Sequence, residues 1–251
     1  MSVGQVALVA LAGFLAGALN AIIGSGSLIT FPTLLAVGLP PLTANVTNTV
    51  GLVFGSGSAV VGYRRELRPQ LRRALWLAIP SLLGAVTGAV LLLVLPQSAF
   101  GFIVSLLVAF AVLLVIVQPL ISSRLTPDGT APPWARYGLP IGIFLTGIYG
   151  GYFGAAQGVI LMGLLTVFLR DPIQQLNGLK NVVSGVNNLV AALIFLAVAH
   201  IDWAAAGVIA ITSIIGGQAG SMIGRRLSPL VLRLVIVAAG LAALAKLLLP
   251  M

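Results

Sequence analysis

The chain contains long stretches in which no residue has an ionisable side chain. Residues 1–63 contain no Asp, Glu, Lys, Arg or His, and the same holds for 74–123, 137–169, 181–199 and 203–224. A helix needs roughly 20 apolar residues to cross the hydrocarbon core of a bilayer. Because 59% of the 251 residues are hydrophobic and only 7% are charged, the sequence predicts an all-α polytopic membrane protein surrounded by a lipid bilayer.

Glycine and proline positions divide these stretches into ten helical segments in two runs of five. The first run is expected at 3–23, 28–39, 43–63, 74–95 and 98–119, and the second at 138–153, 158–169, 173–199, 204–224 and 229–249. We expect residues 122–137, which contain several prolines, to form a cytoplasmic linker. The chain is therefore predicted to consist of a first repeat, 1–121, and a second repeat, 138–251.

The two runs match each other at an offset of 132 residues. That offset superposes Gly26 on Gly158, Pro40 on Pro172, and Asn45 on Asn177. An internal repeat with an odd number of segments enters the membrane from the opposite side in its second copy, which predicts inverted repeats. Each repeat is expected to contain a broken helical hairpin plus three transmembrane helices.

The basic residues lie in short loops between the apolar stretches, which is typical of residues that set membrane orientation and not of a nucleic-acid partner. We place the loop with five arginines between residues 64 and 73 in the cytoplasm and count each broken pair as a hairpin. The other arginine-bearing loops then also fall inside, whereas both termini fall outside. If the second pair of segments, 138–153 and 158–169, instead formed one continuous span, Arg225 and Arg226 would fall outside. We expect a multi-pass protein of the bacterial inner membrane.

Short motifs recur in order in the two halves. They are Gly24-Ser25-Gly26-Ser27, Leu39-Pro40-Pro41 and Ala44-Asn45-Val46-Thr47-Asn48, then Gly154-Ala155-Ala156-Gln157-Gly158, Leu176-Asn177-Gly178-Leu179-Lys180-Asn181 and His200-Ile201-Asp202-Trp203. The ordered set resembles the sulfite exporter TauE/SafE family of membrane permeases over nearly the whole chain. This resemblance implies efflux of sulfite, organosulfonates or related small anions from the bacterial cytoplasm.

Each glycine-rich break is expected near the middle of the membrane, at the start of a short helix. A broken helix in lipid needs protein or a wet cavity to satisfy its backbone, so the breaks predict a cavity. Two facing half-helix N-termini form an anion site without a fixed charge. We expect the anion to contact Ser25, Gly26, Ser27, Gln157 and Gly158. The alternative is that the glycines only allow close helix packing.

Lys180 is the charged residue that lies deepest in an apolar segment, about 10 Å along its helix. No acidic residue lies at comparable depth, so a bound anion is its expected counter-ion, with snorkelling to the interface as the alternative. Four amides are expected to line the same site: Asn45, Asn48, Asn177 and Asn181. Their alternative role is hydrogen bonding between helices. Tyr149 and Tyr152 flank the second break and are predicted to act as a gate, unless they only pack.

All four acidic residues lie in loops or at segment ends: Glu66, Asp128, Asp171 and Asp202. A proton relay or sodium site built on carboxylates is therefore not expected, and no metal or cofactor is predicted. Export would be driven by the membrane potential, which contributes about 2.3 kcal/mol per charge for each 100 mV.

Other functions need a different pattern of polar residues. An anion channel or a permease for another small anion is one alternative. A channel needs a continuous stripe of polar residues, whereas the polar residues here are concentrated near the middle of the membrane. A serine hydrolase at Ser25 or Ser27 is disfavoured because the single histidine, His200, is expected at the far end of another segment. The sequence thus predicts a transporter and not an enzyme. The anion transported and the oligomeric state, a homodimer included, are left open.

Overall fold

The computed structural model describes residues 1–124, 135–169 and 171–223, together with a few positions after residue 236. These residues form helices joined by short turns, without any strand. Helical stretches long and apolar enough to cross a membrane, within this described part, are Val3–Ile22, Arg64–Val94, Ile173–Val198 and Trp203–Ile223. The predicted all-α polytopic membrane architecture is confirmed.

The helices start and end within a few residues of the predicted segments, except that α6 runs five residues further. In chain order they are α1 (Val3–Ile22), α2 (Ser27–Ala36), α3 (Pro41–Gly62), α4 (Arg64–Leu67), the 3-10 helix η1 (Arg68–Gln70), α5 (Leu71–Val94), α6 (Gln97–Arg124), α7 (Ala135–Tyr152), α8 (Gln157–Phe168), α9 (Ile173–Val198) and α10 (Trp203–Ile223). The arginine cluster, which is predicted to be a plain loop, contains the short helices α4 and η1. The segment predicted at 229–249 and most of the predicted linker lie outside the described residues.

A hairpin is formed by α1 and α2. The N–H groups of Ile23 and Gly24 both donate to Leu19 O, at 2.7 and 2.9 Å, and Gly24 has a φ of 83°. This helix-ending turn favours glycine because a Cβ is strained at positive φ. The chain then reverses, so that Gln5 Nε2 near the start of α1 donates to Val37 O just after α2, at 3.3 Å.

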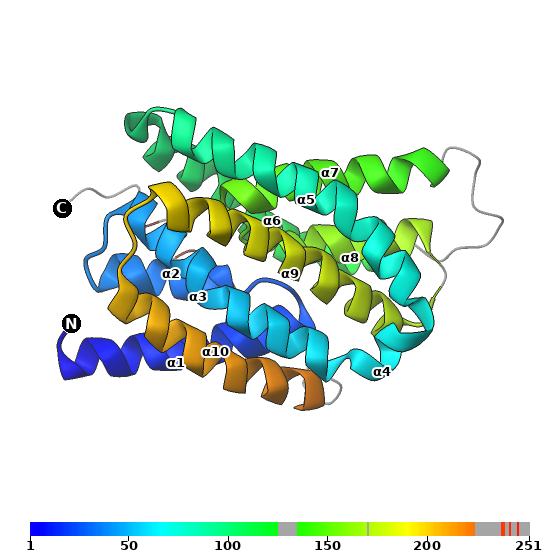
Figure 1. The fold of residues 1–251 in the computed structure, drawn as a ribbon, viewed down its shortest axis with the longest axis horizontal. Helices are drawn as coiled ribbons and strands as arrows, with labels where there is room; N and C mark the ends of the chain where they lie inside the picture. The colour runs from blue at the N-terminus through cyan, green and yellow to red at the C-terminus, as the bar shows by residue number, and fades with distance from the viewer. Residues whose placement is uncertain (125–134, 170, 224–236, 239–240, 242–244, 246–251) are drawn as a thin grey trace.

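The same turn separates α7 from α8. The N–H groups of Phe153 and Gly154 donate to Tyr149 O at 2.9 and 3.1 Å, and Gly154 has a φ of 75°. Near the far end of α8, Leu164 lies against Gly142 in the early part of α7. The two hairpins begin at opposite ends of the bundle: α1 starts at the end with the N-terminus, and α7 starts at the other end, where α4 also lies (Figure 1).

The repeat offset changes along the chain. The N-caps of α2 and α8 are Gly26 and Ala156, which are 130 positions apart, whereas Pro40 and Pro172, the N-caps of α3 and α9, are 132 apart. The difference arises because α8 has 12 residues and α2 has 10. At the break itself, Gly26 therefore corresponds to Ala156 and not to Gly158.

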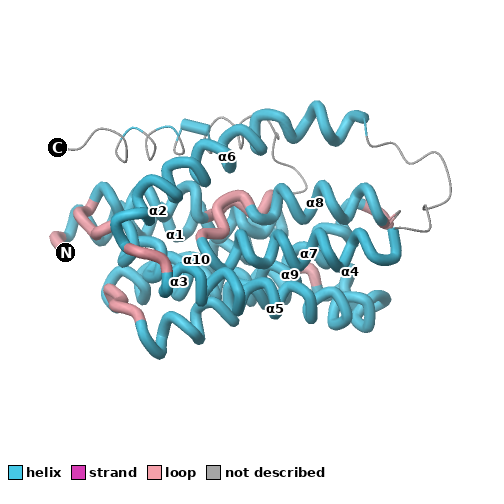
Figure 2. Tube along the Cα trace, turned by 90° about the horizontal axis from the view of Figure 1, so that it is seen from above, coloured by secondary structure: helices cyan, strands magenta, loops and turns pink. Residues whose placement is uncertain are grey.

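Helices from the two halves pack against each other. The most extensive contacts are those of α1 with α10, α5 with α7, and α3 with α10, and α3 also contacts α9 (Figure 1). A Cβ on Gly17 of α1 would overlap the backbone of Ser213, and one on Gly151 of α7 would overlap the backbone of Ala85. Such close backbone approach through small residues is the usual packing of helices in lipid. Both breaks lie within the length of this bundle (Figures 1 and 2).

Charged residues mark the two ends of the bundle. At one end, Arg73 Nη1 pairs with Asp171 Oδ2 at 2.5 Å, which joins the start of α5 to the turn before α9. At the other end, Met1, His200 and Asp202 line one shallow groove. This separation follows the predicted one, with the arginine-rich loop at one end and the N-terminus at the other.

Candidate functional site

The two glycine-rich breaks touch each other inside the bundle. Gly158 N donates to Gly24 O at 2.9 Å, and a Cβ on either glycine would overlap the backbone of the other. Ser25 and Gln157 are only 1% and 3% exposed. The structure therefore brings together the predicted site residues of both breaks, although Ser25 and Gln157 lie 132 residues apart in sequence.

Backbone N–H groups without a described hydrogen-bond acceptor lie where the short helices α2 and α8 begin. Among the described residues, the N–H groups of Ser25, Gly26, Ser27, Ala155 and Ala156 have no hydrogen-bond acceptor. The first turn of a helix leaves its N–H groups unpaired, and the helix dipole adds positive partial charge there. Because nearly all buried backbone N–H groups in proteins are paired, these donors indicate a place for a ligand that accepts hydrogen bonds.

Two side chains add polar atoms at the same place. Ser25 Oγ and Gln157 Nε2 are buried and have no partner in the described part of the chain. A hydroxyl can donate, and an amide nitrogen can only donate. A site without charged groups, in which hydrogen-bond donors predominate, is suited to bind the oxygen atoms of a small oxyanion.

Lys180 contacts the end of α1 instead of an acidic residue. Its Nζ donates to Asn20 O and Ala21 O at 3.2 and 3.1 Å, and the side chain is fully buried. Asn181 Nδ2 also donates to Ala21 O, at 3.2 Å. The last carbonyls of a helix lack donors and form the negative end of its dipole, so they stabilise the ammonium group. This partner is not among those predicted for Lys180 from the sequence, although the last carbonyls of any helix that ends inside lipid need hydrogen-bond donors.

Asn45 donates a hydrogen bond to the C-terminal end of α7, as Lys180 and Asn181 do to the C-terminal end of α1. Its Nδ2 donates to Tyr152 O, the last residue of α7, at 3.0 Å. Its Oδ1 is buried without a partner in the described residues. The third helix of each half thus holds the end of the first helix of the other half, which fixes the two breaks relative to each other.

Asn48 holds the start of α2. Its Nδ2 donates to Ser27 Oγ at 3.0 Å, and its Oδ1 accepts from Thr30 Oγ1. These bonds orient the first turn of α2, whose free N–H groups form part of the candidate site. Asn48 therefore lies next to the first break.

The predicted gate residues Tyr149 and Tyr152 lie near the second break, whereas Asn177 lies away from both breaks. Tyr149 OH donates to Ala155 O, so this side chain closes its own hairpin at the second break. The ring of Tyr152 packs against Phe100, with the ring centres 6.2 Å apart. Asn177 Nδ2 donates to Tyr63 OH at 3.0 Å, and this contact joins α9 to the residue between α3 and α4, away from the breaks.

Asn187 is a polar neighbour of the second break that the predicted set of site residues leaves out. Its Nδ2 donates to Gly147 O at 2.9 Å, while its buried Oδ1 has no partner in the described residues. A Cβ on Gly150 would meet both Asn187 Oδ1 and the amide of Gln157. Its position two turns along α9 from Lys180 is a signal in the sequence that points to the same helix face.

Comparison with known proteins gives one family and several curated relatives. The sequence profile described as "Sulfite exporter TauE/SafE" matches residues 9–247. "Probable membrane transporter protein ORF9" of Sinorhizobium sp is 31% identical, with 84% of this chain and 79% of that protein aligned. "Probable membrane transporter protein" of Haemophilus influenzae is 29% identical (83% and 81%), and YfcA of Escherichia coli K12 is 26% identical (82% and 76%). No solved structure matches the chain significantly.

Proposed function

Because the chain belongs to the sulfite exporter TauE/SafE family and is a multi-pass membrane transporter, we propose that it exports small sulfur-containing anions from the cytoplasm. The substrate class is sulfite or an organosulfonate. The anion binds where the two breaks meet, between the N-termini of α2 and α8. No catalytic step is involved: Ser25 is buried at the first break, whereas His200 lines a groove at one end of the bundle.

The observation that supports this proposal most directly is the set of donors without acceptors at the breaks. Ser25 Oγ, Gln157 Nε2 and the leftover N–H groups are held in place by the packing of Gly24 on Gly158. Backbone donors at helix N-termini bind oxyanions without a fixed counter-charge, which allows the substrate to leave again. Lys180 contributes a positive charge beside this place.

We further propose that the halves 1–121 and 138–251 are inverted repeats that exchange roles during transport. The contact of α1 with α10 has its counterpart in the contact of α7 with α5, as exchange of the halves requires. The break residues are buried from both ends, which corresponds to a closed state of an alternating-access cycle. In our orientation, the arginine-rich end faces the cytoplasm and the N-terminus lies outside the inner membrane.

Lys180 also supports a mechanism without a coupling ion. In broken-helix transporters, the carbonyls at a half-helix C-terminus coordinate the coupling cation. Here the ammonium group of Lys180 contacts those carbonyls at the end of α1. We propose that Lys180 is a tethered replacement for such a cation, so that the membrane potential alone drives export.

The binding site can be tested with two variants that remove one donor each. We expect Ser25→Ala and Gln157→Leu each to weaken sulfite binding about tenfold or more, because a hydrogen bond to a charged group contributes roughly 1.5–3 kcal/mol. Thr87→Val is the matched control, since Thr87 is exposed on α5 and bonds only to Leu83 O of its own helix. Calorimetric titration of the purified protein with sulfite measures the affinity. Wild-type affinity in both variants would place the anion elsewhere.

The driving force can be tested in proteoliposomes loaded with sulfite. We expect efflux to rise with a potassium-diffusion potential that is negative inside and to need no pH gradient, because the described membrane helices contain no carboxylate at the depth of the breaks. The measurement is the initial rate of sulfite release with and without each gradient. Transport that requires a pH gradient while the potential is held at zero contradicts this mechanism.

A further inference from the structure

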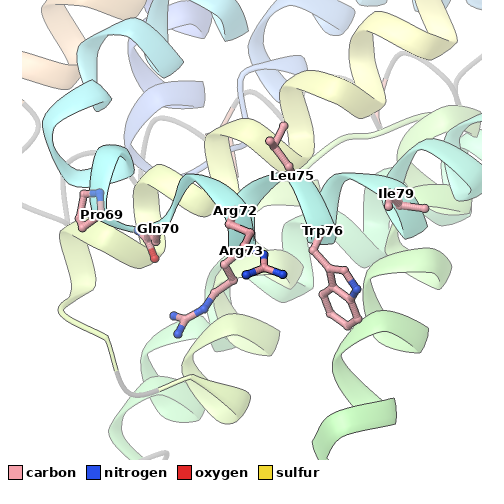
Figure 3. Close-up of a pocket in the computed structure, with 7 residues that line it drawn as sticks. All are labelled: Pro69, Gln70, Arg72, Arg73, Leu75, Trp76 and Ile79. Carbon is pink, nitrogen blue, oxygen red and sulfur yellow. The ribbon is translucent and has the colours of Figure 1, made fainter.

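A groove of about 680 Å³ opens on the outer face of the bundle where α5 begins. Arg72, Arg73 and Trp76 line it near the arginine-rich end, and Ile79 lies one turn further along α5 (Figure 3). Figure 3 shows the two guanidinium groups and the indole ring pointing away from the helix on the same side. The groove therefore combines positive charge with an aromatic and an aliphatic side chain.

The two arginines of this groove differ in their partners. Arg73 is paired with Asp171 at 2.5 Å. No acidic residue in the described parts of the chain pairs with Arg72, and its side chain is exposed. Arg72 thus has its five N–H donors available, and a guanidinium binds phosphate oxygens in a planar two-bond geometry.

The face of α5 that continues from Arg72 is apolar, and no described residue covers it. Trp76, Ile79 and Leu83 follow Arg72 at helical spacing and are 53%, 58% and 53% exposed. Val86 and Val90 continue the same exposed stripe into the second half of the helix. A ligand with a charged head and a long apolar tail matches this surface, because the charge lies at the membrane boundary and the stripe runs into the membrane.

We infer that this groove binds an anionic phospholipid, with the phosphate group on Arg72 and an acyl chain along Ile79, Leu83 and Val86. The Trp76 ring lies at the level of the headgroup, where tryptophan is favoured because one part of it is apolar and the other donates a hydrogen bond. The site is separate from the breaks, which are buried inside the bundle.

Native mass spectrometry of the full chain with added phosphatidylglycerol tests this inference. Arg72→Gln and Trp76→Ala are expected to lower the affinity for phosphatidylglycerol, the first by about fivefold, since one basic residue near an anionic headgroup contributes about 1 kcal/mol. Arg64→Gln is the matched control, because it removes the same charge at the same end of the bundle but lies outside the groove. Phosphatidylcholine with the same acyl chains has no net charge, so it is expected to bind the wild type more weakly than phosphatidylglycerol and to lose less affinity in Arg72→Gln.

Three results would overturn the inference. An equal loss of affinity in Arg64→Gln would mean that the whole basic end attracts lipid without a specific site. Displacement of the lipid by inorganic phosphate alone would mean that the groove recognises a free anion. A dimer of the wild-type chain that Trp76→Ala dissociates would mean that a second copy covers this face. The melting temperature in lipid-free detergent is expected to be unchanged in Arg72→Gln, because the side chain is exposed and pairs with no acidic residue in the described parts of the chain.

Discussion

Replacing Lys180 with methionine is expected to weaken sulfite binding by roughly tenfold to a hundredfold and to reduce transport at least as much. Methionine keeps most of the volume of the buried side chain but removes the positive charge. The variant loses the positive charge beside the proposed anion site, which is the reason for the weaker sulfite binding. The two hydrogen bonds from Nζ to Asn20 O and Ala21 O at the end of α1 are lost as well. Calorimetric titration and proteoliposome transport measure both effects, with the exposed Arg65→Gln as a control for the loss of one charge.

Lys180→Ala separates two roles of the same residue. If the ammonium is a tethered cation, its removal leaves the carbonyls of Asn20 and Ala21 with space for a small metal ion. We then expect the melting temperature of Lys180→Ala, but not that of the wild type, to rise with sodium compared with the large cation N-methylglucamine. A variant that shows no sodium dependence contradicts the tethered-cation role. Unchanged sulfite affinity in either Lys180 variant removes this residue from the anion site.

The sequence alone predicts the helices well because lipid imposes a simple rule. A stretch of about 20 residues without charges has to form a helix that satisfies its own backbone in the bilayer. The turns at Gly24 and Gly154 can also be predicted, because both helices end in a conformation with positive φ that glycine adopts without strain. By contrast, the short helix α4 in the arginine cluster cannot be predicted from the sequence, because charged residues there are compatible with either a loop or a helix.

The contacts within the candidate site cannot be predicted from the sequence in the same way. That Gly24 meets Gly158 depends on how two halves pack, and a repeat offset read from sequence does not contain this information. The N-caps Pro40 and Pro172 are 132 positions apart, whereas the N-caps at the two breaks are 130 apart, since α8 is two residues longer than α2. Because the sequence places no acidic residue at the depth of Lys180, it indicates that the ammonium group has a partner other than a carboxylate. Only the structure identifies that partner as the end of α1.

The contact between the two breaks leads to the second prediction of large effect. Gly158→Ala is expected to lower the stability of the protein by at least about 3 kcal/mol and to abolish sulfite transport. The added Cβ would overlap the backbone of Gly24 and approach Ile23 O. Backbone atoms in two packed helical hairpins cannot move aside as a flexible side chain can, so the breaks have to separate. The hydrogen bond from Gly158 N to Gly24 O is lost with them.

Gly163→Ala is the matched control for this prediction. Gly163 lies on the same short helix, α8, and a Cβ there meets nothing within 4 Å. The control is expected to be neutral or slightly stabilising, since alanine is favoured over glycine in a helix by about 1 kcal/mol. Thermal unfolding in detergent and sulfite efflux from proteoliposomes compare the two variants, and Gly158→Ala is expected to melt roughly 10 °C lower. A Gly158→Ala protein that is both stable and active would show that the breaks need not touch, and the anion site would then have to be sought away from the N-termini of α2 and α8.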